Sequence, residues 1–358
     1  MNPLGERLAR AIRATGPLTV ADYMAAALTD PEYGYYRRAD PLGAGGDFTT
    51  APEISQVFGE LIGLWLADCW QQMGSPTPVR LIELGPGRGT LMRDALRAGR
   101  NVSGWRDAVD LHLIEINPAL RSVQQERLGA HRPSWHDSLD DVPAGPMLLV
   151  ANEFFDALPI RQLVFAEGAW RERFVDWNET DGFHFTVASA PSPLTLLLVE
   201  GGPDPAEHSV LEISPASIGV ADQIARRVTQ SGGAALIVDY GRGATETGQS
   251  LQAVSRHSFA QVLENPGEAD LSAHVDFGML AQAAREAGAA CFGPTGQGDF
   301  LKTLGIVERA TQLQRAASQD QSAALEAAIA RLTEPSAMGT LFKVLAIADG
   351  KIRPAGFS

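Results

Sequence analysis

The spacing of apolar residues changes several times along the chain, and each change predicts an element. Between residues 52 and 73 apolar residues recur every three to four positions, which predicts a long helix opened by a Thr50–Glu53 capping box. Continuous apolar runs predict buried strands, and helical runs lie between them. The expected strands are 79–84, 111–116, 147–151, 234–239 and 341–347, and the other expected helices are 4–29 with a break at Gly16–Pro17, 90–98, 118–128, 217–229, 275–287 and 318–331. This alternation favours an α/β fold with a parallel sheet.

The segment between residues 162 and 191 has a different pattern. Short runs of alternating apolar and polar residues are separated there by Gly168 and by Asp181–Gly182, which is typical of hairpins. We therefore expect an antiparallel insertion in the α/β fold.

Composition and charge narrow the possible functions. The chain has 29 Lys+Arg against 43 Asp+Glu, a formal net charge of −14, which opposes nucleic-acid binding and suits cationic ligands. Its 2 cysteines allow neither a disulfide framework nor a cysteine zinc site, so we expect a reducing, cytoplasmic compartment. No apolar run approaches the roughly 20 residues of a membrane-spanning helix. We interpret the arginines between residues 7 and 13 as part of an ordinary first helix rather than a mitochondrial presequence.

The sharpest motif is Glu-Leu-Gly-Pro-Gly-Arg-Gly-Thr at residues 83–90, between a predicted strand and a predicted helix. Gly85, Gly87 and Gly89 allow a tight turn and let a ligand approach the backbone closely. Their spacing is not G-x-G-x-x-G, and no Gly-Lys-Ser/Thr follows, so a dinucleotide site and a P-loop are both disfavoured. Glu83 at the strand end suits a ligand with a cationic amino group, such as S-adenosylmethionine. A tight turn without a ligand is the alternative.

Two further strand ends carry candidate ligands for that cofactor. Glu115 ends the second predicted strand, where a carboxylate can accept hydrogen bonds from both ribose hydroxyls. Asp137 and Ser138 follow a possible third strand and are candidates for contact with the adenine edge. A solvent-exposed glutamate is the alternative for Glu115.

Residues 152–159 follow the strand 147–151 and should lie at the same edge of the sheet. Asn152, Glu153 and Asp156 are the polar candidates there, and Asp239 ends another core strand. Two carboxylates can orient a guanidinium or amine and accept its proton, although Asp156 can instead cap a helix. Glu212 is a further acid candidate, and His274 is interpreted as structural.

Other catalytic classes find little support. The sequence has neither a G-x-S-x-G nor an H-E-x-x-H motif, and its 7 histidines are scattered. We therefore expect no metal centre and no nucleophilic hydrolase.

The chain resembles the MidA-like class I methyltransferases over nearly its whole length. Residues 46–56, Gly-Asp-Phe-Thr-Thr-Ala-Pro-Glu-Ile-Ser-Gln, are the most specific part of this resemblance. The other segments that carry it are 16–17, 23–24, 34–36, 83–89, 152–159, 239–241, 273–277, 297–301, 304–306 and 339–345.

The resemblance implies a Rossmann-like class I methyltransferase sheet with an N-terminal helical extension and an antiparallel insertion or lid. The implied boundaries are 1–76 for the extension, 77–161 with 211–358 for the core, and 162–210 for the insertion. S-adenosylmethionine is the implied cofactor. Its expected binding residues are Gly46, Asp47, Thr49, Glu83, Gly85, Gly87, Gly89, Thr90, Glu115, Ile116, Asp137, Ser138 and Asn152, and the expected catalytic residues are Glu153, Asp156 and Asp239.

The family also implies an activity. Its mitochondrial members are complex I assembly factors that symmetrically dimethylate an arginine of the quinone-site subunit, so we expect a protein-arginine methyltransferase acting on that subunit or a bacterial counterpart. The expected location is the bacterial cytoplasm, against the mitochondrial matrix for eukaryotic relatives, without membrane insertion. A small-molecule methyltransferase and a non-catalytic assembly chaperone that binds the cofactor are the alternatives.

Overall fold

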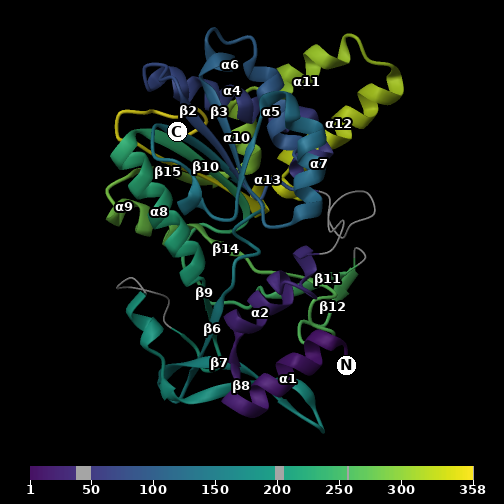
Figure 1. Ribbon diagram of the computed structural model, residues 1–358, viewed down its shortest axis with the longest axis vertical. Coiled ribbons are helices and arrows are strands. Elements are labelled where there is room, and N and C mark those ends of the chain that lie inside the picture. The colour runs from purple at the N-terminus through teal and green to yellow at the C-terminus, as the bar shows by residue number, and fades with distance from the viewer. Residues whose placement is uncertain (38–49, 198–204, 256–257, 358) are drawn as a thin grey trace.

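The computed structural model describes residues 1–37, 50–197, 205–255 and 258–357. A central sheet covered by helices on both faces forms one part of the molecule, and N-terminal helices with antiparallel strands form a second part at its lower end (Figure 1). No helix among the described residues is long and apolar enough to cross a membrane.

The central sheet is mostly parallel. Its strand order is β4-β3-β2-β5-β10-β16-β15, and β14 pairs with the end of β10. The strands from β4 to β10 run parallel, whereas β16 is antiparallel to both of its neighbours. The strands are β2 Val79–Leu84, β3 Val109–Ile114, β4 Ser134–His136, β5 Met147–Asn152, β10 Gly233–Arg242, β14 Val275–Asp276, β15 Ala290–Gly296 and β16 Phe342–Ala348. This mixed α/β architecture confirms the expected fold class.

Both faces of the sheet are buried, which explains why its strands are continuously apolar. Leu236 and Val238 of β10 pack on one face, and Ala235 and Ile237 pack on the other. The first face is covered by α4 Gln56–Gln72, α5 Thr90–Gly99, α6 Trp105–Ala108, α7 Pro118–Leu128, α10 Gln297–Thr303, α11 Ile306–Gln314, α12 Gln319–Thr333 and α13 Met338–Leu341. The second face is covered by α8 Pro215–Ser231 and α9 Phe277–Glu286.

The lower part of the molecule combines distant segments of the chain. Its antiparallel sheet has the order β1-β7-β6-β9, with β8 beside β7, and a small sheet has the order β12-β11-β13. The elements are α1 Pro3–Thr15, β1 Leu18–Thr19, α2 Val20–Thr29, the 3-10 turn η1 Tyr35–Arg37, β6 Arg161–Ala166, β7 Ala169–Asn178, β8 Gly182–Pro191, β9 Val210–Ile213, β11 Gln252–Ser255, β12 Ser258–Ala260 and β13 Asp270–Ser272. Because β1 belongs to the N-terminal extension, this sheet is larger than the expected insertion, and the domain boundaries stay a prediction.

The predicted start of the long helix is wrong. A short helix, α3 Ala51–Ile54, comes first, and Ser55 then takes an extended conformation with φ −154° before α4 begins. The Ser55 side chain accepts a hydrogen bond from the Val57 N–H at 3.2 Å, while Thr50 makes no side-chain cap. Glu53 instead accepts a hydrogen bond from the Thr90 hydroxyl. A tertiary contact therefore replaces the local capping box.

Candidate cofactor and substrate cleft

A cleft of about 420 Å³ lies at the carboxyl ends of β2, β3 and β5. This volume is within the usual range of small-molecule sites, and strand ends of an open α/β sheet are where such sites form. Tyr36 and Thr50 of the N-terminal extension complete the walls. The predicted site residues that line the cleft are Glu83, Gly85, Gly87, Thr90, Glu115, Ile116, Asp137, Ser138, Asn152 and Glu153.

The glycine loop has the conformation that its sequence suggests. Gly85, Gly87 and Gly89 have φ of 61°, 52° and 77°, a left-handed region that side chains disfavour. At Gly85 a Cβ atom would also lie 3.0 Å from the Phe154 ring. Gly89 begins α5 and is not among the lining residues, so its role is in the turn itself.

Glu83 is a buried carboxylate with unused bonding capacity. Its side chain is 3% exposed, and Oε2 is buried without a hydrogen-bond partner among the described residues. Burial, and then the charge of Glu115, raises the pKa of Glu83 to about 8. Since an unpaired buried polar atom is costly, a cationic amino group in the cleft would both satisfy this oxygen and favour its charge.

Glu115 is held from behind by groups of the following helix. Its Oε1 accepts the Asn117 N–H at 2.8 Å, and its Oε2 accepts the Gln124 amide at 3.2 Å. Burial raises the pKa of Glu115, although these two hydrogen bonds oppose that shift. The next residue, Ile116, accepts a hydrogen bond from Arg37 at 2.6 Å, which ties the N-terminal extension to the end of β3.

Three other predicted cofactor residues already have protein partners. The Thr90 hydroxyl donates to Glu53 and accepts from Arg127. Asp137 pairs with Arg121 at 2.6 Å, and Ser138 donates to Asp141 at 2.9 Å. These side chains line the cleft while serving local structure.

The carboxylates near β5 and β10 lie in three different environments. Glu153 lines the cleft with φ 50°, and its Oε1 accepts the Ala51 N–H at 2.9 Å and the Asn152 amide at 3.1 Å. Burial raises the pKa of Glu153 to about 7. The Asn152 Oδ1 atom is buried without a hydrogen-bond partner in the described ranges.

Asp239 does not line the cleft. Its Oδ2 accepts the N–H groups of Phe154, Phe155 and Asp156 at 3.1, 2.9 and 3.2 Å, and its Oδ1 accepts that of Tyr240 at 2.9 Å. The side chain therefore fixes the loop that carries Glu153. Asp156 also lies outside the lining, where it accepts a hydrogen bond from the Tyr240 hydroxyl, and burial raises its pKa to about 6.

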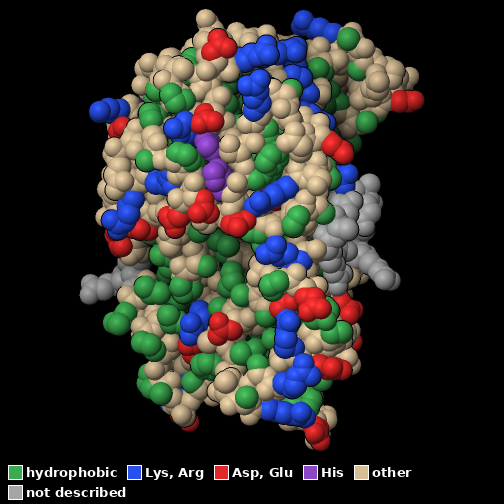
Figure 2. All heavy atoms as spheres, viewed as in Figure 1, with side chains coloured by type: hydrophobic (Ala, Val, Ile, Leu, Met, Phe, Trp, Pro, Cys, Tyr) green, Lys and Arg blue, Asp and Glu red, His purple; other side chains and the backbone are tan. Residues whose placement is uncertain are grey.

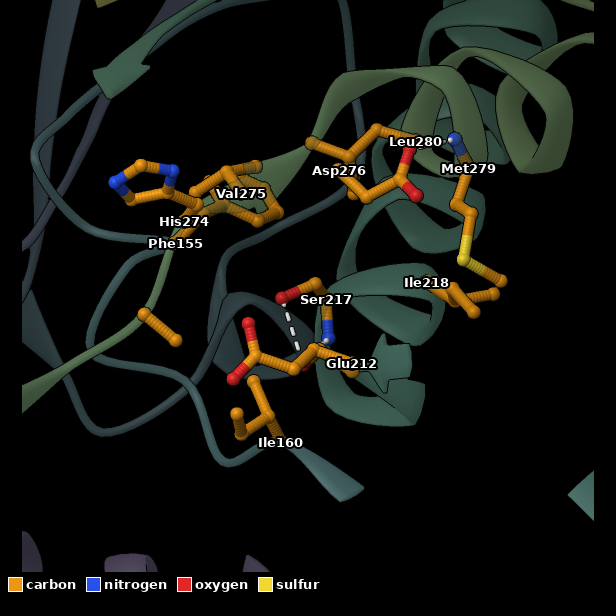
Figure 3. A pocket seen from close by; sticks show the side chains of 12 residues that line it. Phe155, Ile160, Glu212, Ser217, Ile218, His274, Val275, Asp276, Met279 and Leu280 are labelled. Carbon is orange, nitrogen blue, oxygen red and sulfur yellow. Dashed lines mark hydrogen bonds between the residues drawn. The ribbon is translucent and has the colours of Figure 1, made fainter. Parts of the chain in front are cut away.

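A second cavity, of about 20 Å³, lies behind this loop (Figure 3). Glu212, Ser217 and His274 line it, and the Ser217 hydroxyl donates to Ser214 at 2.8 Å. Such a volume holds one water molecule and no substrate. Glu212 is engaged by the N–H groups of Ser250 and Leu251, so its role here is structural.

Three expected cofactor residues lie outside the described part of the chain, and one residue that contacts the site was not predicted. Gly46, Asp47 and Thr49 fall in the range 38–49, outside the described residues. Gln124 was missed, although its amide donates to the Gly87 carbonyl at 2.7 Å and to Glu115. No local pattern marks this glutamine, because it resembles any other polar residue on a helix.

The Rossmann-like sheet, the glycine loop and the strand-end acids define an S-adenosylmethionine-dependent methyltransferase fold. The chain belongs to the family described as "Putative S-adenosyl-L-methionine-dependent methyltransferase", whose sequence profile matches residues 61–295. This finding confirms the family, the enzyme class and the cofactor that the sequence predicted.

Relatives of known name and structure agree with this assignment. The "Protein arginine methyltransferase NDUFAF7 homolog, mitochondrial" of Drosophila melanogaster is 37% identical over 97% of this chain and 85% of its own. The Danio rerio "Protein arginine methyltransferase NDUFAF7, mitochondrial" is 38% identical over 96% and 86%. A "likely methyl transferase" from Burkholderia thailandensis, solved bound to S-adenosyl-homocysteine, is 27% identical with a TM-score of 0.81, covering 99% of this chain and 93% of that one.

Proposed function

We propose that this enzyme methylates arginine side chains of a protein. The names of the Drosophila and zebrafish relatives support a protein-arginine substrate. Within the chain, the observation that carries the proposal is Glu153, a half-buried carboxylate on the cleft wall directly after β5.

Glu153 has the properties that a guanidinium partner needs. Its Oε1 accepts hydrogen bonds from the Ala51 N–H and the Asn152 amide, and its Oε2 accepts none from the described residues. A pKa of about 7 means that the free carboxyl is partly protonated at neutral pH, and an arriving guanidinium would favour its charged form. Charge-assisted hydrogen bonds from arginine to this oxygen would orient one nitrogen towards the reaction centre.

The chemistry of transfer is simple in outline. S-adenosylmethionine supplies an electrophilic methyl group when bound. The substrate nitrogen forms the new N–C bond as the S–C bond breaks, the electron pair of that bond stays on sulfur, and the nitrogen loses one proton. In this proposal Glu153 accepts that proton, and Asp239 holds the loop that carries Glu153 through the N–H groups of residues 154–156.

We extend the proposal to symmetric dimethylation of the quinone-site subunit of respiratory complex I, or its bacterial counterpart, in the bacterial cytoplasm. The family resemblance supports this finer assignment. The relatives named above are called mitochondrial, which supports a mitochondrial location for the eukaryotic members of the family.

Mass spectrometry of protein methylation tests the proposal. The enzyme is incubated with labelled S-adenosylmethionine and a lysate of cells that lack it, and labelled residues are mapped. We expect label on arginine, and we expect Glu153→Gln to slow transfer by about 100-fold while S-adenosylhomocysteine still binds.

Glu179→Gln is the matched control, since Glu179 is an exposed acid of the lower region whose side chain is 85% exposed. Label on a small molecule instead of protein would replace the substrate assignment. Cofactor binding without any transfer would favour the chaperone alternative.

A further inference from the structure

A second large cavity lies at the opposite edge of the central sheet from the cofactor cleft. Its volume is about 430 Å³, close to that of the cleft. Val109, the first residue of β3, lines it, which places it at the amino ends of the parallel strands. The basic residues that line it are Arg93, Arg97, Arg100, Arg106, His131 and Arg132. We call it the arginine groove.

The positive charge of the groove is only partly neutralised by the protein. Arg93 and Arg97 pair with Asp94, and Arg97 also pairs with Glu60. In contrast, Arg100, Arg106 and Arg132 are exposed and have neither a carboxylate partner nor a side-chain hydrogen bond within the described ranges. Basic side chains gather at the top of the molecule, over the end that carries α5 and α6 (Figure 2).

The charge of the groove is opposite to that of the whole chain. The formal net charge of the chain is −14, yet several arginines that repel one another lie together in this groove. Long-range attraction of a large polyanion is opposed by that excess, whereas a small anion inside the groove feels mainly the nearby guanidinium groups, because charges beyond about 8 Å are screened at physiological salt.

The wall beneath the arginines is rigid. Trp105 is 2% exposed and stacks edge-on against Trp70 with ring centroids 5.5 Å apart. It also packs so closely on α5 that a Cβ atom at Gly99 would lie 2.4 Å from its Nε1. The Nε1 donor is buried against Gly99 with no partner among the described residues, so Trp105 forms a fixed wall of the groove and is not counted among its ligands.

We propose that the arginine groove is a binding site for a small phosphate-bearing anion, with Arg100, Arg106 and Arg132 as its principal ligands. One planar guanidinium group can donate two parallel hydrogen bonds to two oxygens of a phosphate. The described residues that line the groove include several arginines and no lysine. Its concave shape and volume suit a small ligand. The phosphate belongs either to a soluble molecule or to a lipid headgroup, and this site is independent of the methyl-acceptor assignment.

Calorimetry with pyrophosphate tests the site in the full-length protein. Saturating S-adenosylhomocysteine is present throughout, so that the cofactor cleft is occupied. We expect saturable binding that Arg106→Gln and Arg132→Gln each weaken about tenfold, and that the double variant weakens about a hundredfold.

Arg10→Gln is the matched control, because Arg10 is exposed on α1 and has no side-chain partner among the described residues. Its binding of pyrophosphate should equal that of the wild type. Unfolding temperatures of all variants without pyrophosphate show that each one folds.

Co-sedimentation with phosphatidylglycerol vesicles distinguishes the two sources of phosphate. Pyrophosphate binding that the groove variants lose supports a soluble ligand, and vesicle binding that the same variants lose supports a lipid headgroup. The proposal is overturned if neither probe binds, or if the groove variants and the Arg10→Gln control bind alike.

Discussion

The two halves of the cleft carry the same sequence signal but use it differently. In the β2–β3 half, Glu83 and Glu115 follow or end strands and both line the cleft. In the β5–β10 half, Glu153 and Asp156 follow β5 and Asp239 lies three residues before the end of β10, yet of these three only Glu153 lines the cleft. A carboxylate at a strand end therefore indicates the edge of the sheet where a site forms, and its hydrogen-bond partners decide whether it serves the ligand or the fold.

The partners explain the difference in detail. Glu83 keeps one oxygen without a donor among the described residues, whereas Asp239 accepts four backbone N–H groups and is 0% exposed. Substitutions that separate ligand binding from stability test this contrast directly.

The largest effect is expected for Gly87→Val, in the β2–β3 half. The residue has φ 52° and lines the cleft, so a branched side chain would be strained and would occupy ligand space. We expect the affinity for S-adenosylhomocysteine to fall by about a thousandfold or more in calorimetry. Gly168→Val is the control, because Gly168 also has positive φ but a side chain there would meet none of the described residues within 4 Å of its Cβ. Equal affinity in the two variants would refute the cofactor role of the loop.

The next effect concerns the β5–β10 half. Asp239→Ala leaves the N–H groups of residues 154–156 without their acceptor, and we expect a loss of about 3 kcal/mol in the free energy of unfolding by urea. Asp222→Ala, at a half-exposed acid on α8 that pairs with Arg226 on the surface of the same helix, should change it by less than about 0.5 kcal/mol. Wild-type stability together with lost turnover would instead assign Asp239 a direct chemical role.

A smaller effect is expected from pH. Because the pKa of Glu83 is raised to about 8, the ionised form is disfavoured in the folded protein, and stability should fall as pH rises from about 4.5 through 8. A cationic ligand favours the ionised form, so S-adenosylmethionine affinity should rise by up to about tenfold per pH unit below 8. Calorimetry at pH 6, 7 and 8 measures this rise. Glu83→Gln should flatten it, and an unchanged slope in that variant would exclude Glu83 as its source.

The smallest effect is expected for Gln124→Ala. This change removes the hydrogen bonds that Gln124 makes to Gly87 and Glu115 and the one it accepts from the Trp135 indole, and we expect a roughly fivefold loss of S-adenosylhomocysteine affinity. Gln125→Ala is the control, since Gln125 is the exposed neighbour on α7. A loss of the same size in both variants would show that helix stability, and not these side-chain contacts, is responsible.

The sequence predicts features that depend on periodicity. Strand β2 and helix α7 have the predicted bounds, because an apolar run and an Asn117–Pro118 start are local signals. The strand-end positions of Glu83, Glu115 and Glu153 follow from the same signals.

Features that depend on distant contacts were not predictable. Arg37 donates a hydrogen bond to the Ile116 carbonyl, and the Ala51 N–H donates one to Glu153. No local sequence pattern around Arg37 or Ala51 indicates these distant partners. The same reason explains the failed capping box, since Glu53 satisfies Thr90 rather than the backbone of its own helix. The buried position of Asp239 likewise depends on a loop from another strand.

The connection between β5 and β10 has a consequence for how this architecture diversifies. These strands are adjacent in the sheet, yet residues 153–232, which include β6 to β9 and α8, separate them along the chain. The entropy of closing a flexible connection grows only logarithmically, by about 0.6 kcal/mol for each doubling of its length. Insertions in the exposed turns of this stretch, such as residues 179–181 between β7 and β8, therefore change the folding free energy little, and evolution can reshape the lower sheet there while the cofactor half of the molecule stays constant.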